Sequence, residues 1–433
     1  MVNTERNASM PTHKDIKPFD MIIAEGHYYS LNDYETKLNN NVIVVGTSGS
    51  GKTRSVVTPN LLQANTSYVV TDPKGNLYRK YGNYLKKKGY RVVNLDFVNP
   101  RESMHYNPFC YLEDDNDQDF IKTARMLNNE QRNHGYRGDP FWDLTSEMLL
   151  SSLIAYLKNY CNEDDWTVRN LMKLLRACEI EEFEDSESTM DVLIKEAERE
   201  DFEKGKREES FTVRQYKNVR SCAAKTMKSI VISAMACVGN IDTDAMHEMM
   251  AYDELHLERI GYEKTAVFVN VSDTDRSMDN IIQIFFTQAM NVLTREADRN
   301  CEDQRLPIPV RFIMDDFATN CSIDEFPKII ASIRSRNIST TIMIQAEGQL
   351  RAMYGDDDKT IIGNCDTYIY LGGNDRNTAE EISKRSDVPV RKIMNMEIGT
   401  CRVFRRGQAP QEARIFDVDS FLMEKIGRDG KAR

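Results

Sequence analysis

The sequence predicts an α/β protein with a mostly parallel sheet and an inserted all-α domain, and three observations support this prediction. Residues 46–53 read GTSGSGKT directly after the apolar run NVIVV, which is the pattern of a phosphate-binding loop behind a buried strand. Strand patterns alternate with helical patterns up to about residue 112 and again from residue 265, as expected for a parallel sheet. Between about residues 117 and 250 only helical patterns occur.

The first part of the chain is expected to begin the α/β domain. Residues 1–19 are expected to form a flexible N-terminal segment, since the start of the chain is polar. A short hairpin that breaks at Gly26 is predicted within residues 21–31. The predicted buried strands are residues 41–45, 67–72 and 91–96, and the predicted helix between the last two is residues 78–88.

The middle of the chain is predicted to be an all-α insertion over residues 114–258. Its helical runs are residues 120–128, 140–160, 167–177, 189–207 and 213–238. Pro140 suits a first helical turn, with Asp139 as the N-cap. The acidic run at residues 179–187 is most simply a solvated connection.

The last part of the chain is predicted to return to the same sheet. A long amphipathic helix is expected at residues 280–299, and an edge hairpin at residues 399–406 and 412–418. The expected strands are residues 265–271, 309–316, 340–345 and 367–373. We therefore expect a discontinuous nucleotide-binding domain over residues 20–113 and 259–433.

Composition limits the class of protein. The chain has 433 residues, 40% of them apolar and 29% charged, which is typical of a soluble globular protein of two domains. The most apolar run, residues 148–157, is shorter than the roughly 18 residues that span a bilayer. The nine cysteines form no metal-binding or disulfide pattern, so a reducing cytosol is expected. A net charge of −11 argues mildly against a simple duplex-binding module.

The phosphate-binding loop predicts ATP as ligand and Mg²⁺ as cofactor. Its glycines allow positive φ and a close approach of the backbone, so that successive N–H groups can surround phosphates. Lys52 can reach the β and γ oxygens, and the Thr53 hydroxyl can bind Mg²⁺. The residues expected to bind the nucleotide are Gly46, Thr47, Ser48, Gly49, Ser50, Gly51, Lys52, Thr53 and Arg54. The alternative is a Gly/Ser-rich turn that binds nothing.

Further candidates lie at the ends of predicted strands. Asp315 is assigned to the metal and Asp316 to the activation of water, although two acids can also simply end a strand in solvent. Gln345 can sense the γ-phosphate or merely cap its strand. Arg334 and Arg336 are candidates for an arginine that stabilises phosphoryl transfer in a neighbouring subunit. The alternative is an ordinary surface arginine, which is much more common.

Asp72 ends the strand predicted next to the phosphate loop. It could help to order the metal site, or it could cap the turn that follows, where Pro73 and Gly75 favour bending.

Several motifs resemble those of the type IV secretion coupling proteins of conjugative elements, the TraG/TraD type, between about residues 20 and 417. The motifs, in order, are GTSGSGKT, TPNLL, YVVTDPKGNLY, DPFWDLTSEMLLSSLIAYL, FIMDDFATN, IRSRNISTTIMIQAEGQLRAMYG and YIYLGGNDRNTAEEISKRS. The resemblance implies a RecA-like P-loop NTPase core that assembles as a homo-hexamer when active. A monomer in isolation is an alternative left open. The resemblance implies that Lys52, Asp316, Arg334 and Gln345 are catalytic and that Thr53 and Asp315 hold the metal.

The resemblance also implies partners and a location. A relaxase with single-stranded DNA is the expected cargo, delivered to the ATPases or membrane components of a type IV secretion channel. The family usually has a membrane anchor, and the sequence shows none. We therefore expect a cytoplasmic protein that lies at the inner face of the membrane, through a separate tethering protein or by docking on the secretion machinery.

Besides the missing anchor, the chain departs from the family at Asp316, where the family usually has glutamate. The shorter side chain implies either slow hydrolysis or compensation by ring closure, because a shift of about 1 Å can cost on the order of 100-fold in rate. A nucleotide-regulated substrate receptor with weak hydrolysis is therefore a second hypothesis. A chromosome-type DNA translocase is a third, and the all-α insertion argues against it.

Overall fold

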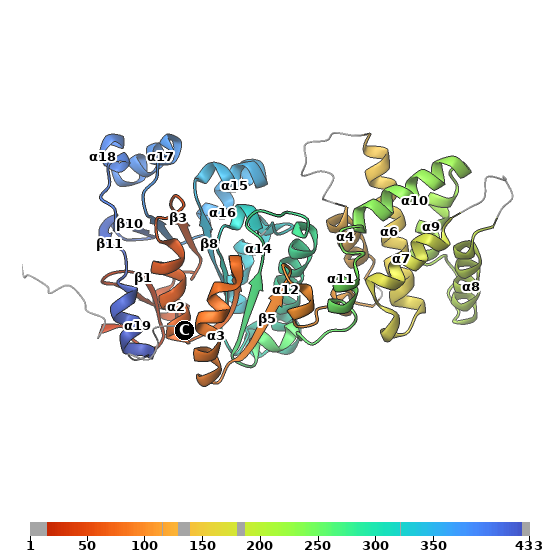
Figure 1. The fold of residues 1–433 in the computed structure, drawn as a ribbon, viewed down its shortest axis with the longest axis horizontal. Helices are drawn as coiled ribbons and strands as arrows, with labels where there is room; N and C mark the ends of the chain where they lie inside the picture. The colour runs from red at the N-terminus through yellow and green to blue at the C-terminus, as the bar shows by residue number, and fades with distance from the viewer. Residues whose placement is uncertain (1–14, 115, 129–138, 180–186, 321, 427–433) are drawn as a thin grey trace, which may run out of the picture. The chain divides into compact units, whose positions relative to one another are not determined.

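The computed structural model describes residues 15–114, 116–128, 139–179, 187–320 and 322–426, which form two compact units (Figure 1). Among these residues, the first unit comprises those up to Asn94, Leu257–Asp273 and those from Leu293 onward. The second comprises Leu95–His256 and Thr274–Val292. We propose that the helical part of the second unit is the all-α insertion predicted at residues 114–258.

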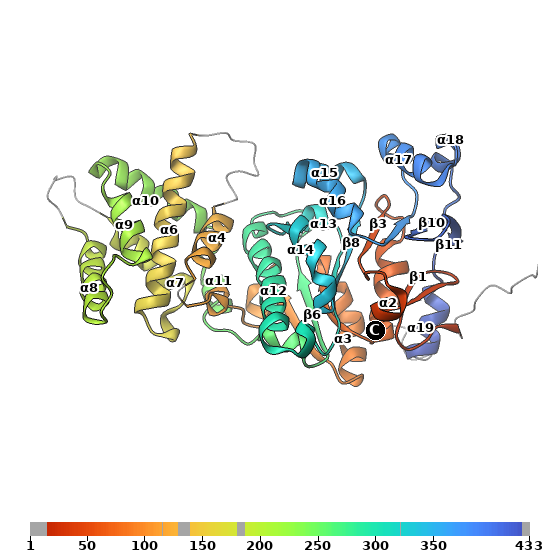
Figure 2. The same cartoon turned by 180° about the vertical axis from the view of Figure 1, so that it is seen from behind.

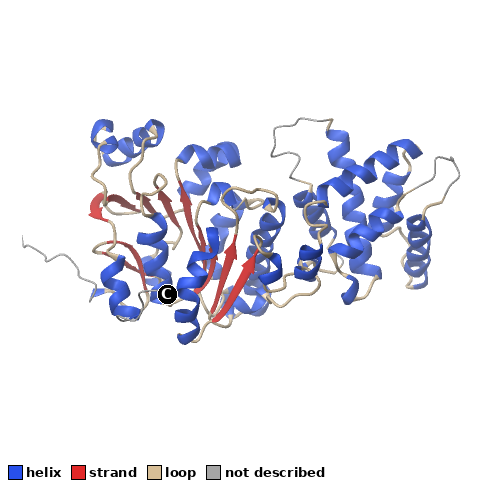
Figure 3. Ribbon diagram, in the orientation of Figure 1, coloured by secondary structure: helices blue, strands red, loops and turns tan. Residues whose placement is uncertain are grey.

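A mixed sheet is the centre of the α/β architecture (Figure 3). Its strands in the described residues are β3 (Val42–Val45), β4 (Ser67–Thr71), β5 (Arg91–Asp96), β6 (Thr265–Asn270), β7 (Val310–Met314), β8 (Ile338–Ile344), β9 (Thr367–Tyr370), β10 (Thr400–Arg405) and β11 (Gln411–Arg414). Their order is β11-β10-β9-β3-β8-β7-β4-β6-β5. β3 pairs in parallel with β8 and β9, and β7 pairs in parallel with β8 and β4. The predicted α/β class with a mostly parallel sheet is confirmed.

Two pairs of strands form antiparallel hairpins, and both hairpins were predicted. β10 pairs with β11 at one edge of the sheet. β1 (Asp20–Ala24) and β2 (His27–Ser30) form a separate two-stranded sheet around Gly26, whose φ is +74°. Glycine reaches this left-handed region without the steric cost that a Cβ would add.

The helices of the first unit connect the strands. They are α1 (Asp33–Thr36), α2 (Thr58–Gln63), α3 (Asn76–Lys87), α13 (Phe317–Asn320), α14 (Phe326–Ser332), α15 (Glu347–Tyr354), α16 (Asp358–Gly363), α17 (Arg376–Ser386), α18 (Val390–Met394) and α19 (Val418–Ile426). Residues two apart on a strand share a face of the sheet. On one face a buried apolar cluster joins Val42 and Val44 of β3, Tyr68 and Val70 of β4, Leu61 of α2, Leu85 of α3 and Phe421 of α19.

In the described residues of the second unit the regular elements are helices, apart from the last two residues of β5. The helices of this unit are α4 (Asp117–Leu127), α6 (Pro140–Tyr160), α7 (Val168–Ala177), α8 (Thr189–Glu203), α9 (Phe211–Arg220), α10 (Ala224–Val238) and α11 (Asp244–Met249), and α12 (Asp279–Asn300) begins in it. In Figures 1 and 2, α6 lies between α4 and α9, and α10 packs against it as well. The run predicted to be too short for a bilayer is buried here, since Leu149–Leu157 of α6 face packed neighbours on all sides.

Two predictions about this unit need correction, and one is confirmed. The single helix predicted over residues 213–238 is wrong, because α9 ends at Arg220 and α10 begins at Ala224. The Ser221 hydroxyl donates to the Asn218 carbonyl (2.8 Å), which satisfies a free acceptor at the end of α9 without any proline or glycine signal. The helix expected to reach Arg207 stops at Glu203, because Gly205 adopts φ +85°. The predicted cap is confirmed, since the Asp139 carboxylate accepts from the Phe141 N–H (3.0 Å).

Two further expectations fall mainly outside the described residues. They are the flexible N-terminal segment, of which residues 1–14 are not described, and the acidic connection, of which residues 180–186 are not described.

Candidate nucleotide-binding site

The loop between β3 and α2 has a backbone shape that depends on its glycines. Gly49 and Gly51 adopt φ of +78° and +89°, the left-handed region in which a side chain is strained. At Gly46 a Cβ atom would lie 2.9 Å from the Leu371 Cβ and 2.5 Å from the Ser50 Oγ. The Ser50 hydroxyl is itself buried and has no hydrogen-bond partner among the described residues. The loop therefore has a close backbone curve with an unsatisfied polar group inside it.

Lys52 closes this loop. Its buried ammonium group donates to the carbonyl oxygens of Gly46 (2.7 Å) and Thr47 (3.3 Å). Directly after it, the chain turns into a short π-helical segment, Thr53–Val57, that continues as α2. The N-terminal N–H groups of this helical run lie beside the lysine, and such N–H groups attract phosphate. The ammonium group can exchange a carbonyl oxygen for a phosphate oxygen with a small side-chain movement.

Thr53 and Asp315 meet at the carboxyl edge of the sheet. The Thr53 hydroxyl donates to Asp315 Oδ2, across 262 positions of sequence. Asp315 follows β7, and its N–H donates to the hydroxyl of Thr71 on β4 (2.6 Å). Burial raises the pKa of the Asp315 carboxyl above its ordinary value, and the hydrogen bond from Thr53 opposes this rise. Two neighbouring hard oxygen atoms of this kind fit Mg²⁺, which usually takes one or two protein ligands and completes its shell with water and phosphate.

Asp316 has an unusual backbone. Its φ is +48°, and its N–H donates to Asp315 Oδ1 (3.0 Å). Aspartate adopts this left-handed conformation more readily than most residues, because its short side chain can bond locally. The two carboxylates are close enough for the negative charge of Asp316 to contribute to the raised pKa of Asp315.

Gln345 lies between the loop and the two acids. It directly follows β8, which lies between β3 and β7, and the Gly46 N–H donates to the carbonyl of the preceding Ile344 (3.1 Å). The backbone N–H of Gln345 donates to Gln349 Oε1 (2.7 Å), and the Gln345 side chain is exposed. Three adjacent parallel strands therefore bring the loop, the glutamine and the acids to one edge.

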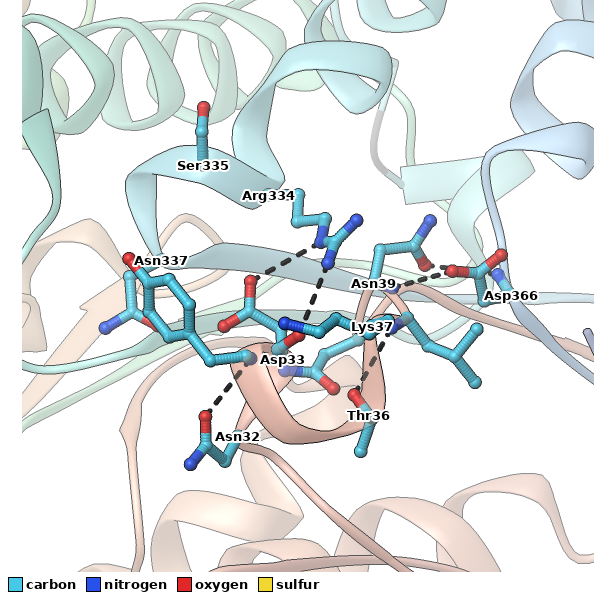
Figure 4. A network of polar contacts seen from close by, with 12 residues as sticks. Asn32, Asp33, Thr36, Lys37, Asn39, Arg334, Ser335, Asn337 and Asp366 are labelled. Atoms are coloured by element: carbon cyan, nitrogen blue, oxygen red, sulfur yellow. Dashed lines mark hydrogen bonds and ion pairs between the residues drawn. The ribbon is translucent and has the colours of Figure 1, made fainter.

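Arg334 lies at the amino ends of the parallel strands, opposite the ends where Gln345 and the two acids lie. It belongs to the 3₁₀ turn Ile333–Arg336, which precedes β8, whereas Gln345 follows β8. Figure 4 shows its guanidinium group beside Asp33 of α1, with Nε 3.4 Å from Asp33 Oδ2. The structure thus brings Lys52, Thr53, Asp315 and Asp316 together with Gln345 and separates Arg334 from them, while Arg336 pairs with Asp298 (2.8 Å).

The strand that Asp72 follows was predicted to lie next to the phosphate loop, and this prediction is wrong. β4 is not next to β3, because β8 and β7 lie between them. The Asp72 carboxylate accepts from the N–H groups of Leu77 (2.9 Å) and Tyr78 (2.8 Å) in the first turn of α3. Of the two roles left open by the sequence, capping therefore agrees with these contacts.

Sequence reasoning missed several residues around the loop. Asp419 of α19 pairs with the predicted loop residue Arg54, and the Ile415 side chain would lie 3.9 Å from a Cβ at Gly51. The hydroxyl of Thr71 fixes the backbone of Asp315. None of these contacts has a sequence signal, because each joins segments far apart in the chain.

Comparison with known families gives a match over most of the chain. The family model described as type IV secretory system conjugative DNA transfer matches residues 5–386. No curated protein matches the chain.

Comparison with solved structures gives similar folds at low sequence identity. The bacterial conjugative coupling protein TrwBdeltaN70, in its unbound monoclinic form, has a TM-score of 0.64 at 15% identity, with 91% of this chain and 88% of that chain covered. The plasmid coupling protein TrwB in complex with ADP and Mg²⁺ has a TM-score of 0.63 at 14% identity, covering 91% and 89%. VirB4 of Thermoanaerobacter pseudethanolicus has a TM-score of 0.55 at 13% identity, covering 92% and 96%.

Proposed function

Because the chain belongs to the type IV secretory system conjugative DNA transfer family, we propose that it is a coupling protein that hydrolyses ATP with Mg²⁺ to drive DNA transfer. The observation that carries this proposal is the contact between Thr53 and Asp315 beside the ammonium group of Lys52. These residues provide a cation for the phosphates and two oxygen atoms for the metal. The similar fold of TrwB, whose structure contains ADP and Mg²⁺, agrees with this assignment.

The proposed roles follow from the chemistry of phosphoryl transfer. Backbone N–H groups of the loop residues 46–54 bind the phosphates, and Lys52 neutralises their negative charge. A bound Mg²⁺, held by Thr53 and Asp315, would polarise the β and γ oxygens. Asp316 accepts a proton from the attacking water. The water oxygen forms a bond to the γ-phosphorus, and the bond between the γ-phosphorus and the oxygen that bridges to the β-phosphate breaks. Gln345 orients that water or senses the γ-phosphate.

Arg334 is proposed to act on the site of a neighbouring subunit. The seven residues of β8 separate it from Gln345, and at about 3.3 Å per residue this strand spans roughly 20 Å. That length exceeds what one arginine side chain can cover, so Arg334 cannot serve its own loop. An arginine that acts in trans requires an oligomer, and the family resemblance implies a homo-hexamer as the active state. We therefore expect a monomer in isolation to have little turnover.

The proposed cargo is a relaxase with single-stranded DNA, delivered to the ATPases or membrane components of the secretion channel. Among the described residues, every helix is too short or too polar to cross a membrane. We propose that the protein works at the inner face of the cell membrane, where a tethering partner or the secretion machinery holds it.

The test is ATP turnover measured with and without single-stranded DNA, alongside the solution mass. Turnover should rise with DNA and with oligomerisation, and Lys52→Ala should abolish it. Lys195→Ala is the matched control, because Lys195 is an exposed lysine of α8 that pairs with Glu187. A stable oligomer that binds ATP but shows no turnover with DNA would contradict the motor.

A nucleotide-regulated receptor with weak hydrolysis is the second candidate, and Asp316 motivates it. Asp316→Glu restores the longer carboxylate but places glutamate at a φ of +48°, which it tolerates less well than aspartate. A large gain in turnover would indicate that the native site is weakened and would favour the receptor. A loss would indicate a site adapted to aspartate and would favour the motor.

A further inference from the structure

We propose that Asp33 is a positioning residue that fixes the orientation of the Arg334 guanidinium group for the neighbouring subunit. This inference rests on the proposed role of Arg334 in trans. The two residues are 301 positions apart, and no sequence motif links them. Figure 4 shows Asp33 in the short helix α1, facing the turn that carries Arg334.

Asp33 contacts one edge of the guanidinium group with two different oxygen atoms. Arg334 Nε lies 3.4 Å from the carboxylate oxygen Oδ2, and Nη2 lies 3.3 Å from the backbone carbonyl. A guanidinium group is planar, so two contacts along one edge define both its plane and its direction. A single ion pair to a flexible carboxylate would leave the group free to rotate.

The opposite edge of the guanidinium group stays available. The structure gives Nη1 of Arg334 no hydrogen-bond partner among the described residues. The Arg334 side chain is 41% exposed, whereas the Asp33 side chain is 8% exposed. An arginine that donates to a phosphate oxygen of another subunit needs one edge held in place and the other edge facing solvent. Its outer N–H groups can then bond to the phosphate without a change of side-chain rotamer.

Arg305 holds the carboxylate in place. Its Nη2 lies 2.6 Å from Asp33 Oδ1 and 2.9 Å from Asn337 Oδ1, and its guanidinium carbon lies 4.9 Å from the centre of the Tyr34 ring. Nη1 of Arg305 also donates to Asp33 Oδ2 (3.4 Å), so Arg305 binds both carboxylate oxygens and fixes the orientation in which Oδ2 also accepts from Arg334 Nε. Arg305 also donates to the backbone carbonyl of Arg334 (3.4 Å), which links the three residues.

The alternative is that Asp33 only stabilises the fold. Subunit mixing separates the two roles. The donor subunit carries Lys52→Ala and keeps Arg334, and the acceptor subunit carries Arg334→Ala and keeps its nucleotide site. Each should be inactive alone, and their mixture should regain turnover at interfaces where a donor arginine meets an acceptor loop.

Asp33→Ala is then introduced into one subunit at a time. In the donor it should lower kcat of the mixture by about 10-fold to 100-fold, the range expected when a catalytic group is misplaced by about 1 Å. In the acceptor, which already lacks Arg334, it should cost no more than about twofold. The Kd for ATP, measured by calorimetry, should not change in either case. Asp33→Glu in the donor should retain more activity than Asp33→Ala.

The matched control is Asp366→Asn in the donor. Asp366 is a buried acid that pairs with Arg406 (3.0 Å) and accepts from the Asn39 N–H (2.6 Å) without contacting Arg334. The donor with this change should still support turnover. Equal losses from Asp33→Ala in both subunits, or a loss in neither, would overturn the positioning role. If the starting mixture regains no turnover, the arginine in trans is itself wrong and the positioning role falls with it.

Discussion

Gly46→Ala should disrupt the phosphate loop through a steric overlap that can be worked out from the structure. The new Cβ would lie 2.9 Å from the Leu371 Cβ and 3.2 Å from the Ser50 Cβ. Carbon atoms pack best at about 3.5–4.0 Å, so both neighbours must move by several tenths of an ångström. Neither atom is the end of a flexible side chain, and overpacking of this kind costs about 1–3 kcal/mol. If the native loop shape is required for binding, the affinity for ATP should fall by about 5-fold to 150-fold.

Calorimetric titration with ATP and Mg²⁺ measures this loss directly. Gly348→Ala is the matched control, because Gly348 lies in α15, has no atom within 4 Å of a built Cβ and does not need positive φ. That change should leave binding unaltered and stabilise the helix by up to about 1 kcal/mol. Gly46→Ala with wild-type affinity would refute the steric reasoning, and equal harm from both changes would show that the effect does not come from the loop.

The remaining predictions concern stability. Burial lowers the pKa of His27 from its ordinary value of 6.5, so the folded protein binds fewer protons there than the unfolded chain. The contribution of His27 to the free energy of unfolding is complete above about pH 6.5 and is lost as the pH falls from that value toward the lower folded-state pKa. His27→Gln should therefore make the melting temperature depend less on pH between about pH 8 and pH 5. A variant whose melting temperature has the same pH dependence as the wild type would show that His27 is not the cause. Arg311 of β7 is fully buried with one short contact, to Asn60 Oδ1 (2.9 Å), and burial lowers its pKa to about 10. Arg311→Met should therefore be neutral or stabilising by up to about 4 kcal/mol in thermal unfolding, and a marked loss would show that the buried charge is needed. Asp139→Ala should cost about 1 kcal/mol by removing the cap of α6, which thermal unfolding of the variant would detect, whereas no change would show that the Phe141 N–H finds another acceptor.

Local chemistry within the sequence was enough to predict the secondary structure around the site. The glycines, Lys52 and Thr53 lie within eight residues, and their arrangement depends on backbone conformations that neighbouring residues set. The strands before and after the helical segment were likewise found from apolar periodicity. The break at Ser221 was missed because a helix can end where a side chain satisfies a carbonyl, and periodicity continues across such a break.

The sequence by itself determined the α/β class and predicted a phosphate loop and a helical insertion, because each of these depends on residues that are close together in the chain. Only the tertiary structure decided which strands are neighbours. The insertion of β8 and β7 between β3 and β4 brings Asp315 to Thr53, leaves Asp72 to cap α3, and puts Arg334 beside Asp33 at the opposite edge. Strand order results from how buried faces pack over the whole domain, and the spacing of residues along the chain does not encode it.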